Sequence, residues 1–457
     1  MNDDTITQSV LFPDLVAKPL VATFDQALAS SDGGAVLLRA ADQRLQLTAR
    51  IAACLSEARD PDRVTHALAD LVAQRVFGIA CGYPDANDGA RLADDPIQKL
   101  LLNRHPMHGQ ALASQPTVSR FENGVGPRAL YRLGRELAAG VIERHRRRLR
   151  GRARRITIDL DVTDDPTHGA QQLTFFHGHY DTWCYLPLLA FVTFNDEAEQ
   201  YLCAAMLRPG NAATATGADG LLKRLIVLLR EAFPGVRLRV RLDGGFAHPT
   251  LLANLDLWRV EYVVAMAENA VLTRHAAPLM TGVRAQVAAT HETAHVYGDT
   301  RYAAGSWGAA RRVIIKAEVV QLDGREPRDN ARFVITNLRQ TPQWIYEQVY
   351  CGRGEIENRI KELHHGLDID RTSCSRFWAN QLRVLLTAAA YVLMQELRLH
   401  AARTRYARAQ VTTLRERLLK IGARVVASAR RYLLHLPRAF PDVRAWHTLA
   451  RRLGATT

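Results

Sequence analysis

The chain has 457 residues, and its content of 47% hydrophobic and 23% charged residues is that of a globular protein with two or three domains. The 60 Lys and Arg residues outnumber the 46 Asp and Glu residues, and the formal net charge of +14 favours a polyanionic partner such as nucleic acid. The apolar stretches are shorter than the roughly 20 residues of a membrane span, so no such span is predicted.

Residues 1–150 are predicted to form a helical region for DNA binding and dimerisation, because short helical patterns alternate there with Gly, Pro and Asp. Ser114 can cap a helix on which residues such as Arg120 reach bases or phosphates, as recognition helices do. An ordinary surface helix fits the same pattern. The Arg-rich run over residues 144–155 is either a track for phosphates or a solvated basic surface.

Residues 151–260 are predicted to form the first part of an α/β core. In RRITIDLDV the period-two alternation indicates a strand that carries Asp159 and Asp161 on one face. An apolar run typical of a buried strand follows, and then an amphipathic helix over residues 218–233. A further alternating strand ends at Asp243, so strand, helix and strand indicate an α/β domain.

Three regions make up the rest of the chain. The helical period fades over residues 261–340, where short strand-like runs between turns predict a β-rich insertion. Helical patterns return in the second part of the core, residues 341–400, with a long apolar element from Phe377 to His400. Residues 401–457 are predicted to be a basic helical region with an amphipathic helix from Ala409 to Leu434.

Three acidic residues are candidates for chemistry. Asp161 and Asp243 lie on predicted strands and are followed closely by Thr163 and Gly244 respectively, and Glu357 lies in a helical pattern. Three carboxylates brought together repel unless a cation neutralises them, which predicts Mg²⁺ or Mn²⁺ as cofactor. Two such ions about 3.5 to 4 Å apart can activate a nucleophile and stabilise a leaving oxygen in phosphoryl transfer. Structural caps and surface ion pairs have the same pattern, so these residues alone leave catalysis open.

A stripe of functional side chains surrounds Glu357. On an α-helix Tyr350, Arg353, Glu357 and Lys361 follow one another at intervals of three, four and four residues, which places them on one face. The stripe therefore predicts an aromatic ring, a cation, an anion and a second cation along one side of a helix.

Several spaced motifs together resemble one known family. They are SDGGAVLLR from Ser31, DLDVTDDPTHG from Asp159, FFHGHYDTWCYLPLL from Phe175, RLDGGFA from Arg241, and YCGRGEIENRIKELHHGL from Tyr350. Over about Ser31 to Ser373 the chain resembles the 1380-type insertion-sequence transposases, which are DDE transposases. The resemblance implies a ribonuclease-H-like catalytic core with a β-rich insertion before the glutamate. It also implies an enzyme that binds terminal inverted repeats and catalyses metal-dependent DNA cleavage and strand transfer.

The same resemblance suggests which residues form the catalytic set. It assigns the first aspartate to Asp161 of DVT, with Asp159 on the same strand face as the competitor, and the others to Asp243 and Glu357. These three would also be the ligands of two metal ions.

The resemblance also suggests the contacts with DNA. Tyr350, Arg353 and Lys361 would contact phosphates near the cut, and Arg353 can bind two oxygens at once. The broader hairpin-forming group carries Lys at the position that His364 holds in this chain, so the basic phosphate contact departs from the family pattern.

Other interpretations compete with this one. A ribonuclease-H-like nuclease without strand transfer, or an inactive DNA-binding descendant, fits part of the sequence. A zinc site is set aside, because the spacing of its possible ligands matches no known zinc pattern; they are His168, His177, His179 and Cys184. Four tryptophans could stack on unpaired bases or lie in the core: Trp183, Trp258, Trp307 and Trp344.

The expected partners are double-stranded DNA, as terminal inverted repeats and as target, and further copies of the chain in a homodimer or larger synaptic complex. No membrane partner is expected. The six scattered Cys residues form no CxxC pair, and the N-terminus carries no recognisable signal peptide. We therefore expect a protein of the bacterial cytoplasm that associates with the nucleoid.

Overall fold

A computed structural model describes residues 9–456, so the first eight residues of the predicted helical region lie outside the described residues. The chain divides into two units. The core unit comprises Leu45–Ala58 and Arg120–Gln395, and the terminal unit comprises the described residues up to Arg44, Arg59–Ser119 and those from Glu396 onward. Within residues 9–456, no helix is long and apolar enough to cross a membrane.

The core unit is built on an eight-stranded mixed sheet. Its strands are β4 (Arg155–Val162), β8 (Leu188–Phe194), β9 (Tyr201–Met206), β10 (Arg237–Leu242), β11 (Glu261–Met266), β12 (Ala294–Tyr302), β13 (Arg311–Val320) and β14 (Arg328–Thr336). They lie in the order β12-β13-β14-β11-β10-β4-β8-β9. β4, β8 and β9 are antiparallel neighbours, whereas β10 is parallel to β4 and β11 to β10. β14, β13 and β12 continue the sheet from β11 in antiparallel fashion.

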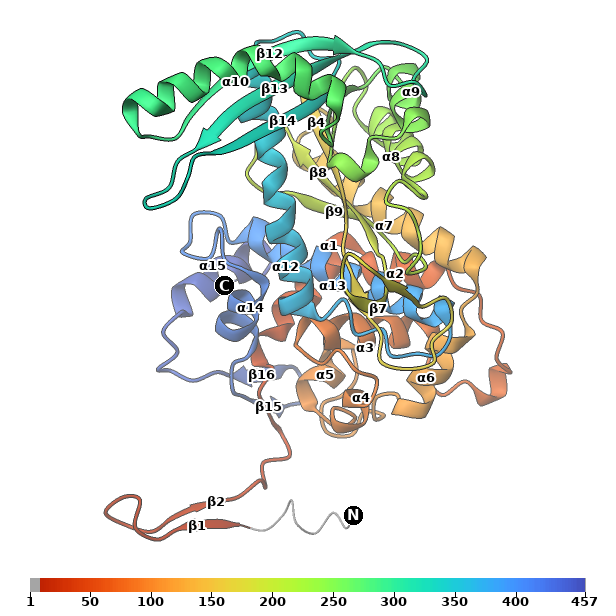
Figure 1. The fold of residues 1–457 in the computed structure, drawn as a ribbon. Coiled ribbons are helices and arrows are strands. Elements are labelled where there is room, and N and C mark those ends of the chain that lie inside the picture. Colours follow the sequence, from red (N-terminus) through yellow and green to blue (C-terminus); the bar gives the residue numbers. More distant parts are fainter. Residues whose placement is uncertain (1–8, 457) are drawn as a thin grey trace. The chain divides into compact units, whose positions relative to one another are not determined.

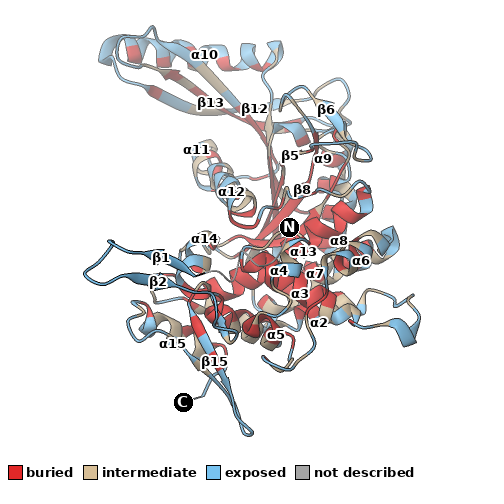
Figure 2. Cartoon of the chain, turned by 90° about the horizontal axis from the view of Figure 1, so that it is seen from below, coloured by how far each residue is buried: buried red, intermediate tan, exposed pale blue. Residues whose placement is uncertain are grey.

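Helices cover this sheet and bury its central strands (Figures 1 and 2). The helices that lie wholly or partly in the core unit are α2 (Leu47–Ala53), α6 (Gln115–Gly124), α7 (Pro127–Arg148), α8 (Ala218–Ala232), α9 (Pro249–Leu257), α10 (Ala270–Thr290), α11 (Pro342–Trp344), α12 (Glu355–Leu367) and α13 (Phe377–His400). α10 packs along β12, β13 and β14 (Figure 1). Every residue of β8 is buried, as expected for an apolar strand in the middle of a covered sheet.

Helix α13 protects the edge of the sheet. It is apolar on nearly all sides and almost entirely buried, as a core helix should be. Two of its buried polar side chains receive backbone hydrogen bonds from the edge strand β9 and the residue that follows it: the amide N–H of Leu202 donates to Gln395 and that of Leu207 donates to Gln381, at 3.1 and 2.7 Å. Since free edges of sheets attract other strands, these glutamines close the edge at β9.

A small three-stranded sheet follows β4 in the chain. Its strands are β5 (Asp165–Pro166), β6 (Phe175–His177) and β7 (Thr182–Tyr185), in the order β5-β7-β6. Gly210 lies tightly against it, because a Cβ atom there would stand 2.1 Å from the carbonyl oxygen of Cys184.

The terminal unit joins short helices and strands from both ends of the chain. They are β1 (Val10–Phe12), β2 (Leu20–Ala22), β3 (Ala29–Ser30), η2 (Gly33–Ala35), α1 (Val36–Leu45), η3 (Pro61–Arg63), α3 (Leu68–Ala80), α4 (Asp88–Arg91), α5 (Pro96–Leu101), α14 (Val411–Leu414), η7 (Arg415–Leu419), β15 (Ala423–Ala427), β16 (Tyr432–His435) and α15 (Val443–Arg452).

The SDGG motif has a structural role in this unit. The buried carboxylate of Asp32 accepts hydrogen bonds from Gln98 and from the ammonium group of Lys420, both at 2.8 Å. A Cβ atom at Gly34 would stand 1.8 Å from the carbonyl oxygen of Leu418, so only glycine fits there. Asp32 and Gly34 thus join the beginning of the chain to its C-terminal part.

Two predicted segments are corrected by the structure. The span 261–340 contains the 21-residue helix α10 besides its strands. Its weak amphipathic pattern and its internal Pro278 obscured the helical period. The helix predicted from Ala409 to Leu434 ends at Leu419, and β15 and β16 follow it. Gly422 and the β-branched pair Val425 and Val426 favour this change from helix to strand.

Candidate active site

The sheet places the two candidate aspartates side by side. β4 and β10 are parallel neighbours, and Asp159 on β4 stands in register with Arg241 on β10. Asp161 therefore lies near the carboxyl end of β4, and Asp243 immediately follows β10, where it caps the short helix η4 (Gly244–Phe246). Ligands in open α/β sheets bind outside the carboxyl ends of the strands, so this edge is the expected place for a site.

One guanidinium group joins these two carboxylates. Nη2 of Arg353 lies 2.9 Å from Oδ2 of Asp161 and 3.3 Å from Oδ2 of Asp243. The other oxygen of each aspartate accepts a backbone hydrogen bond at 2.9 Å, from Val162 and Gly245 respectively. Each aspartate thus turns one oxygen toward the guanidinium group of Arg353, which lies between them.

The electrostatics of Asp161 reflect a crowded acidic site. Its side chain is 12% exposed. The pKa of Asp161 is raised from 3.8 to about 6, chiefly by burial; the charge of Arg353 opposes this rise, and the charges of Asp243 and Glu357 add to it. Glu357 itself is exposed in the first turn of α12. Its charge acts on Asp161, so all three predicted carboxylates belong to one electrostatic cluster.

The helix that carries the predicted stripe is not a uniform α-helix. After α11 the chain forms a π-helix, η5 (Ile345–Tyr350), then a 3-10 turn, η6 (Cys351–Gly354), and then α12. Tyr350, Arg353 and Glu357 consequently lie on three different kinds of turn, and the single α-helical stripe is corrected. Local π and 3-10 geometry within helices is frequent at functional sites.

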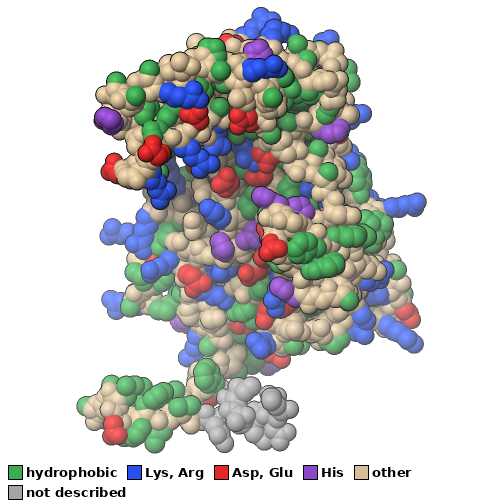
Figure 3. All heavy atoms as spheres, viewed as in Figure 1, with side chains coloured by type: hydrophobic (Ala, Val, Ile, Leu, Met, Phe, Trp, Pro, Cys, Tyr) green, Lys and Arg blue, Asp and Glu red, His purple; other side chains and the backbone are tan. Residues whose placement is uncertain are grey.

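The predicted DNA contacts are distributed differently. Tyr350 is half-buried, and burial raises its pKa. Lys361 is exposed on α12, and Arg120 is exposed on a separate element, α6. Two further cations lie near this helix: Lys316 of β13 stands over the ring of Tyr346 at 5.7 Å, and the charge of Arg332 acts on Tyr346 and Tyr350. Figure 3 shows Lys and Arg side chains mixed with acidic ones around α10 and the neighbouring strands.

Asp159, the competing aspartate, is held in a buried ion pair. It is completely buried, and Arg241 donates to both of its oxygens at 2.6 and 2.7 Å. Gln200 donates a third hydrogen bond at 2.9 Å. Arg241 also donates to the carbonyl oxygen of Val349 at 3.2 Å, and a Cβ atom at Gly352 would lie 2.4 Å from the same guanidinium. The Asp159–Arg241 pair therefore fixes the segment that carries Arg353.

The residue in the expected lysine position belongs to a hydrogen-bonded relay. Nδ1 of His364 lies 3.1 Å from Asp370, and its Nε2 lies 2.9 Å from the hydroxyl of Thr163, two residues beyond Asp161. His364 thereby connects α12 to the end of β4. Sequence reasoning identified His364 as a departure from the family pattern, but Thr163 and Asp370 gave no signal of their own.

Another residue near the carboxylates comes from the turn between β6 and β7. Burial raises the pKa of Tyr180 to about 12, and the charges of Asp164, Asp161 and Asp243 contribute to this rise. The small sheet β5-β7-β6 therefore presents its turn within electrostatic range of both aspartates.

The donor set fits a hard divalent cation. Carboxylate oxygens are the ligands that Mg²⁺ prefers, and the raised pKa of Asp161 marks a place where added positive charge is favourable. Among residues 9–456, no three His, Cys, Asp or Glu side chains converge as a preformed metal centre. Arg353 lies between the two aspartates instead.

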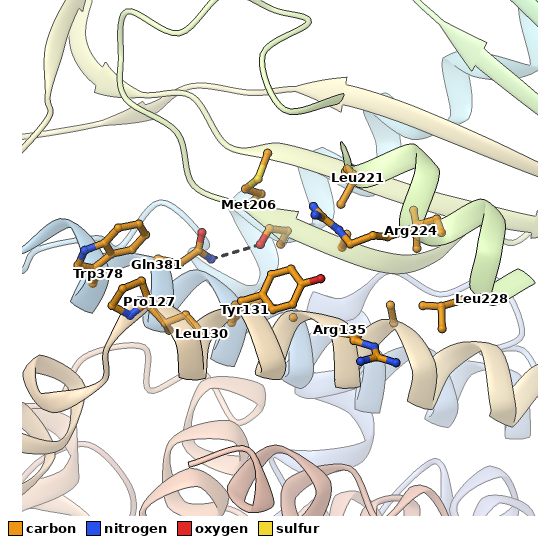
Figure 4. A pocket seen from close by; sticks show the side chains of 16 residues that line it. Pro127, Leu130, Tyr131, Arg135, Met206, Leu221, Arg224, Leu228, Trp378 and Gln381 are labelled. Atoms are coloured by element: carbon orange, nitrogen blue, oxygen red, sulfur yellow. Dashed lines mark hydrogen bonds between the residues drawn. The ribbon is translucent and has the colours of Figure 1, made fainter. Parts of the chain in front are cut away.

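An apolar cavity elsewhere in the core unit lacks these features. It measures about 280 Å³ and lies among α7, α8, β9 and α13 (Figure 4). Tyr131, Arg224 and Trp378 are among its lining residues, and Gln381 donates to the backbone of β9 there. No carboxylate lines it. The acidic cluster, and not this cavity, is therefore the candidate for phosphoryl chemistry.

Comparison with known proteins identifies the class. A family model described as "Transposase DDE domain group 1" matches residues 12–457. The chain belongs to this transposase family. The transposase is accordingly an enzyme of DNA transposition, which cleaves DNA and transfers strands. No curated protein matches the chain.

One similar solved structure is a piggyBac transposase synaptic complex with hairpin DNA. The two proteins share 9% sequence identity, and the match covers 84% of this chain and 80% of the piggyBac chain, with a TM-score of 0.40.

Proposed function

We propose that this transposase binds the terminal inverted repeats of an insertion sequence of the 1380 type, cleaves their phosphodiester bonds and joins the freed 3′-hydroxyl to target DNA. Asp161, Asp243 and Glu357 are its catalytic residues. The observation that carries the proposal is the convergence of Asp161 and Asp243 on one cation, with the charge of Glu357 acting on the same site.

The part of the sheet formed by β9, β8, β4, β10 and β11 is the catalytic core, of the ribonuclease-H-like type. Support comes from the position of the acidic residues at the carboxyl ends of two adjacent parallel strands. The strands β12 to β14 with α10 form the insertion between Asp243 and Glu357. The described residues of the region 1–150 supply DNA binding and dimerisation.

The three carboxylates would hold Mg²⁺ or Mn²⁺, as two ions. Bound metal would supply Lewis acidity toward the phosphate and a stronger nucleophile. The protein contributes the orientation: the backbone N–H groups of Val162 and Gly245 hold the two aspartates, and the Asp159–Arg241 pair holds the helix start.

Arg353, Tyr350, Lys361 and Arg120 are the proposed DNA contacts. Arg353 is well placed because it already bridges Asp161 and Asp243, and a guanidinium can form paired hydrogen bonds with phosphate oxygens. Tyr350 precedes it by three residues at the end of the π-helix. Lys361 and Arg120 are exposed, as phosphate contacts need to be.

The proposed assembly is a homodimer or larger synaptic complex that holds two DNA ends.

The test of the catalytic site measures DNA binding and DNA cleavage separately. Asp243→Asn should retain binding to the inverted-repeat end in a gel-shift assay and lose Mg²⁺-dependent cleavage. Asp164→Asn is the matched control, because this neighbouring acid makes no contact with Arg353 among the described ion pairs. Equal cleavage by wild type and Asp243→Asn would contradict the proposed site.

A further inference from the structure

The backbone pairing of the sheet ends before it reaches the two candidate aspartates. The pairing of β4 with β10 ends at Asp159 and Arg241. Asp161 and Asp243 each come two residues later in the chain. Arg353 bridges their carboxylates, but this side chain is proposed to bind DNA phosphates. Another contact is therefore needed to fix the spacing of the two aspartates while DNA is bound.

Arg208, the second residue after β9, is a buried cation that is held by backbone carbonyl groups. The residue is 3% exposed. Within the described part of the chain its four hydrogen bonds all go to carbonyl oxygens: Nε donates to Leu186 at 2.8 Å, and Nη1 donates to Ala213, Thr214 and Thr216 at 3.1, 2.9 and 3.0 Å. Nη2 has no partner among residues 9–456. A buried charge without an opposite charge is costly, so this arginine needs an explanation other than an ion pair.

One side of the Arg208 contact leads to Asp161. The backbone N–H of Leu186 donates to the carbonyl oxygen of Arg208 at 3.1 Å, so these two residues are joined by reciprocal hydrogen bonds. The carbonyl oxygen of the next residue, Pro187, accepts a hydrogen bond from the backbone N–H of Thr163 at 3.1 Å. Thr163 directly follows β4 and is two residues beyond Asp161. The segment that Arg208 holds therefore lies against the end of β4.

The other side of the contact leads to Asp243. Nη1 of Arg208 gathers three carbonyl oxygens of the loop over residues 213–216. Thr214 of this loop packs directly on Gly245, because a Cβ atom at Gly245 would lie 2.7 Å from Cγ2 of Thr214. The backbone N–H of Gly245 in turn donates to Oδ1 of Asp243 at 2.9 Å. One guanidinium group thus holds both the segment beside β4 and the loop beside Asp243.

We infer that Arg208 is a positioning residue, which sets the separation of Asp161 and Asp243 by fixing the backbone next to each of them. This inference rests on the proposed function and deepens it, because the same two carboxylates would hold the metal ions. Mg²⁺ demands near-ideal octahedral geometry, and groups that orient metal ligands from behind strongly affect metal affinity. A change in the separation of the aspartates should therefore weaken metal binding.

The experiment removes the bridge and keeps the charge. In Arg208→Lys the ammonium is a compact donor on a flexible stem, whereas the rigid fork of arginine reaches both segments. Mn²⁺ binding is measured by electron paramagnetic resonance, with and without the inverted-repeat end, and cleavage is measured over a range of Mg²⁺ concentrations. Arg208→Lys should bind Mn²⁺ about tenfold more weakly than wild type and should need correspondingly more Mg²⁺ for cleavage. Its binding to the DNA end in a gel shift should equal that of wild type.

Arg311→Lys is the matched control. Arg311 is another buried arginine of the core unit, at the start of β13. It donates to the carbonyl oxygen of Ala309 at 3.3 Å and to Asp256 at 2.8 Å. Arg311→Lys should leave Mn²⁺ binding and the Mg²⁺ requirement unchanged, whatever it costs in stability.

A second test reaches the same contact from the side of Asp243 and does not depend on the folding of an Arg208 variant. Gly245→Ala places a methyl group 2.7 Å from the side chain of Thr214, so it should push the loop away and weaken Mn²⁺ binding. Thr214→Gly removes that side chain and keeps the carbonyl oxygen that Arg208 binds. The double variant should therefore regain most of the Mn²⁺ affinity, as expected for two residues in contact.

The outcomes separate this inference from the proposed function. Wild-type Mn²⁺ affinity in Arg208→Lys would overturn the inference and leave the proposed function intact. Loss of DNA binding at unchanged Mn²⁺ affinity would also overturn it, because Arg208 would then act on DNA and not on the aspartates. A defect of Gly245→Ala that Thr214→Gly does not relieve would overturn it as well. A wild type that neither binds Mn²⁺ nor cleaves the DNA end would instead refute the proposed function.

Discussion

Replacing Asp161 by Asn should stabilise the metal-free protein while it abolishes cleavage. Burial, Asp243 and Glu357 together raise the pKa of Asp161 from 3.8 to about 6 against the opposing charge of Arg353. Because the folded state holds this proton more tightly than the unfolded chain, the favourable contribution is complete below pH 3.8 and is lost as the pH rises through about 6. Asn resembles the protonated form and escapes this loss.

The magnitude follows from the same values. A rise of the pKa from 3.8 to about 6 corresponds to about 3 kcal/mol at pH 8. At pH 5 the free-energy cost of ionising Asp161 in the folded state is about half as large, because Asp161 is then mostly protonated in the folded protein. The Asp161→Asn variant should therefore exceed wild type in free energy of unfolding by about 3 kcal/mol at pH 8 and by less at pH 5.

Urea unfolding of metal-free protein, followed by tryptophan fluorescence, measures this difference. Five of the six tryptophans lie in the core unit, so the signal reports on the relevant part of the chain. Asp159→Asn is the control of opposite sign, because it leaves the buried guanidinium of Arg241 without its partner and should cost about 3 to 5 kcal/mol. An Asp161→Asn variant that is less stable than wild type at pH 8, or a difference that does not change with pH, would refute the reasoning.

Two further substitutions test how the site is held. Gly352→Ala should displace Arg241, because the guanidinium of Arg241 lies 2.4 Å from the added Cβ. The free energy of unfolding should fall by about 1 to 3 kcal/mol, and the cleavage rate should fall as well. Gly354→Ala, with open space around the added Cβ, should change neither quantity in the same assays. His364→Gln should move acid unfolding to higher pH, because His364 lowers the pKa of Asp370. A carboxyl whose pKa is depressed in the folded state contributes stability that is present above its unfolded pKa and is lost as the pH falls. An unchanged acid transition, measured by circular dichroism, would contradict that second expectation.

The positions of the two aspartates on or at the end of strands could be predicted from the sequence, because the pattern of their neighbours is regular. Period-two alternation placed Asp161 and Asp243 on strands, and the structure puts both at the carboxyl ends of parallel neighbours. The insertion of strands before Glu357 was also predicted. These signals are local, since alternation of side chains and turn residues is visible within a few positions.

Other features depend on contacts between distant segments. The segment of π and 3-10 turns that carries Tyr350 and Arg353 contacts Arg241, some 110 positions earlier, and no local period discloses this contact. The relay from Asp370 through His364 to Thr163 likewise joins segments 201 positions apart. The helix α10 was missed because its alanine-rich sequence has little amphipathic contrast.

The most direct test of the central claim is a cleavage and joining assay on a labelled linear DNA that carries the inverted-repeat end, with Mg²⁺ or Mn²⁺, for wild type and Glu357→Gln. The account predicts metal-dependent cleaved and joined products with wild type, and none with Glu357→Gln at equal DNA binding. Products that persist in Glu357→Gln, or binding by wild type without any cleavage, would contradict the assignment of this acidic cluster as the catalytic site.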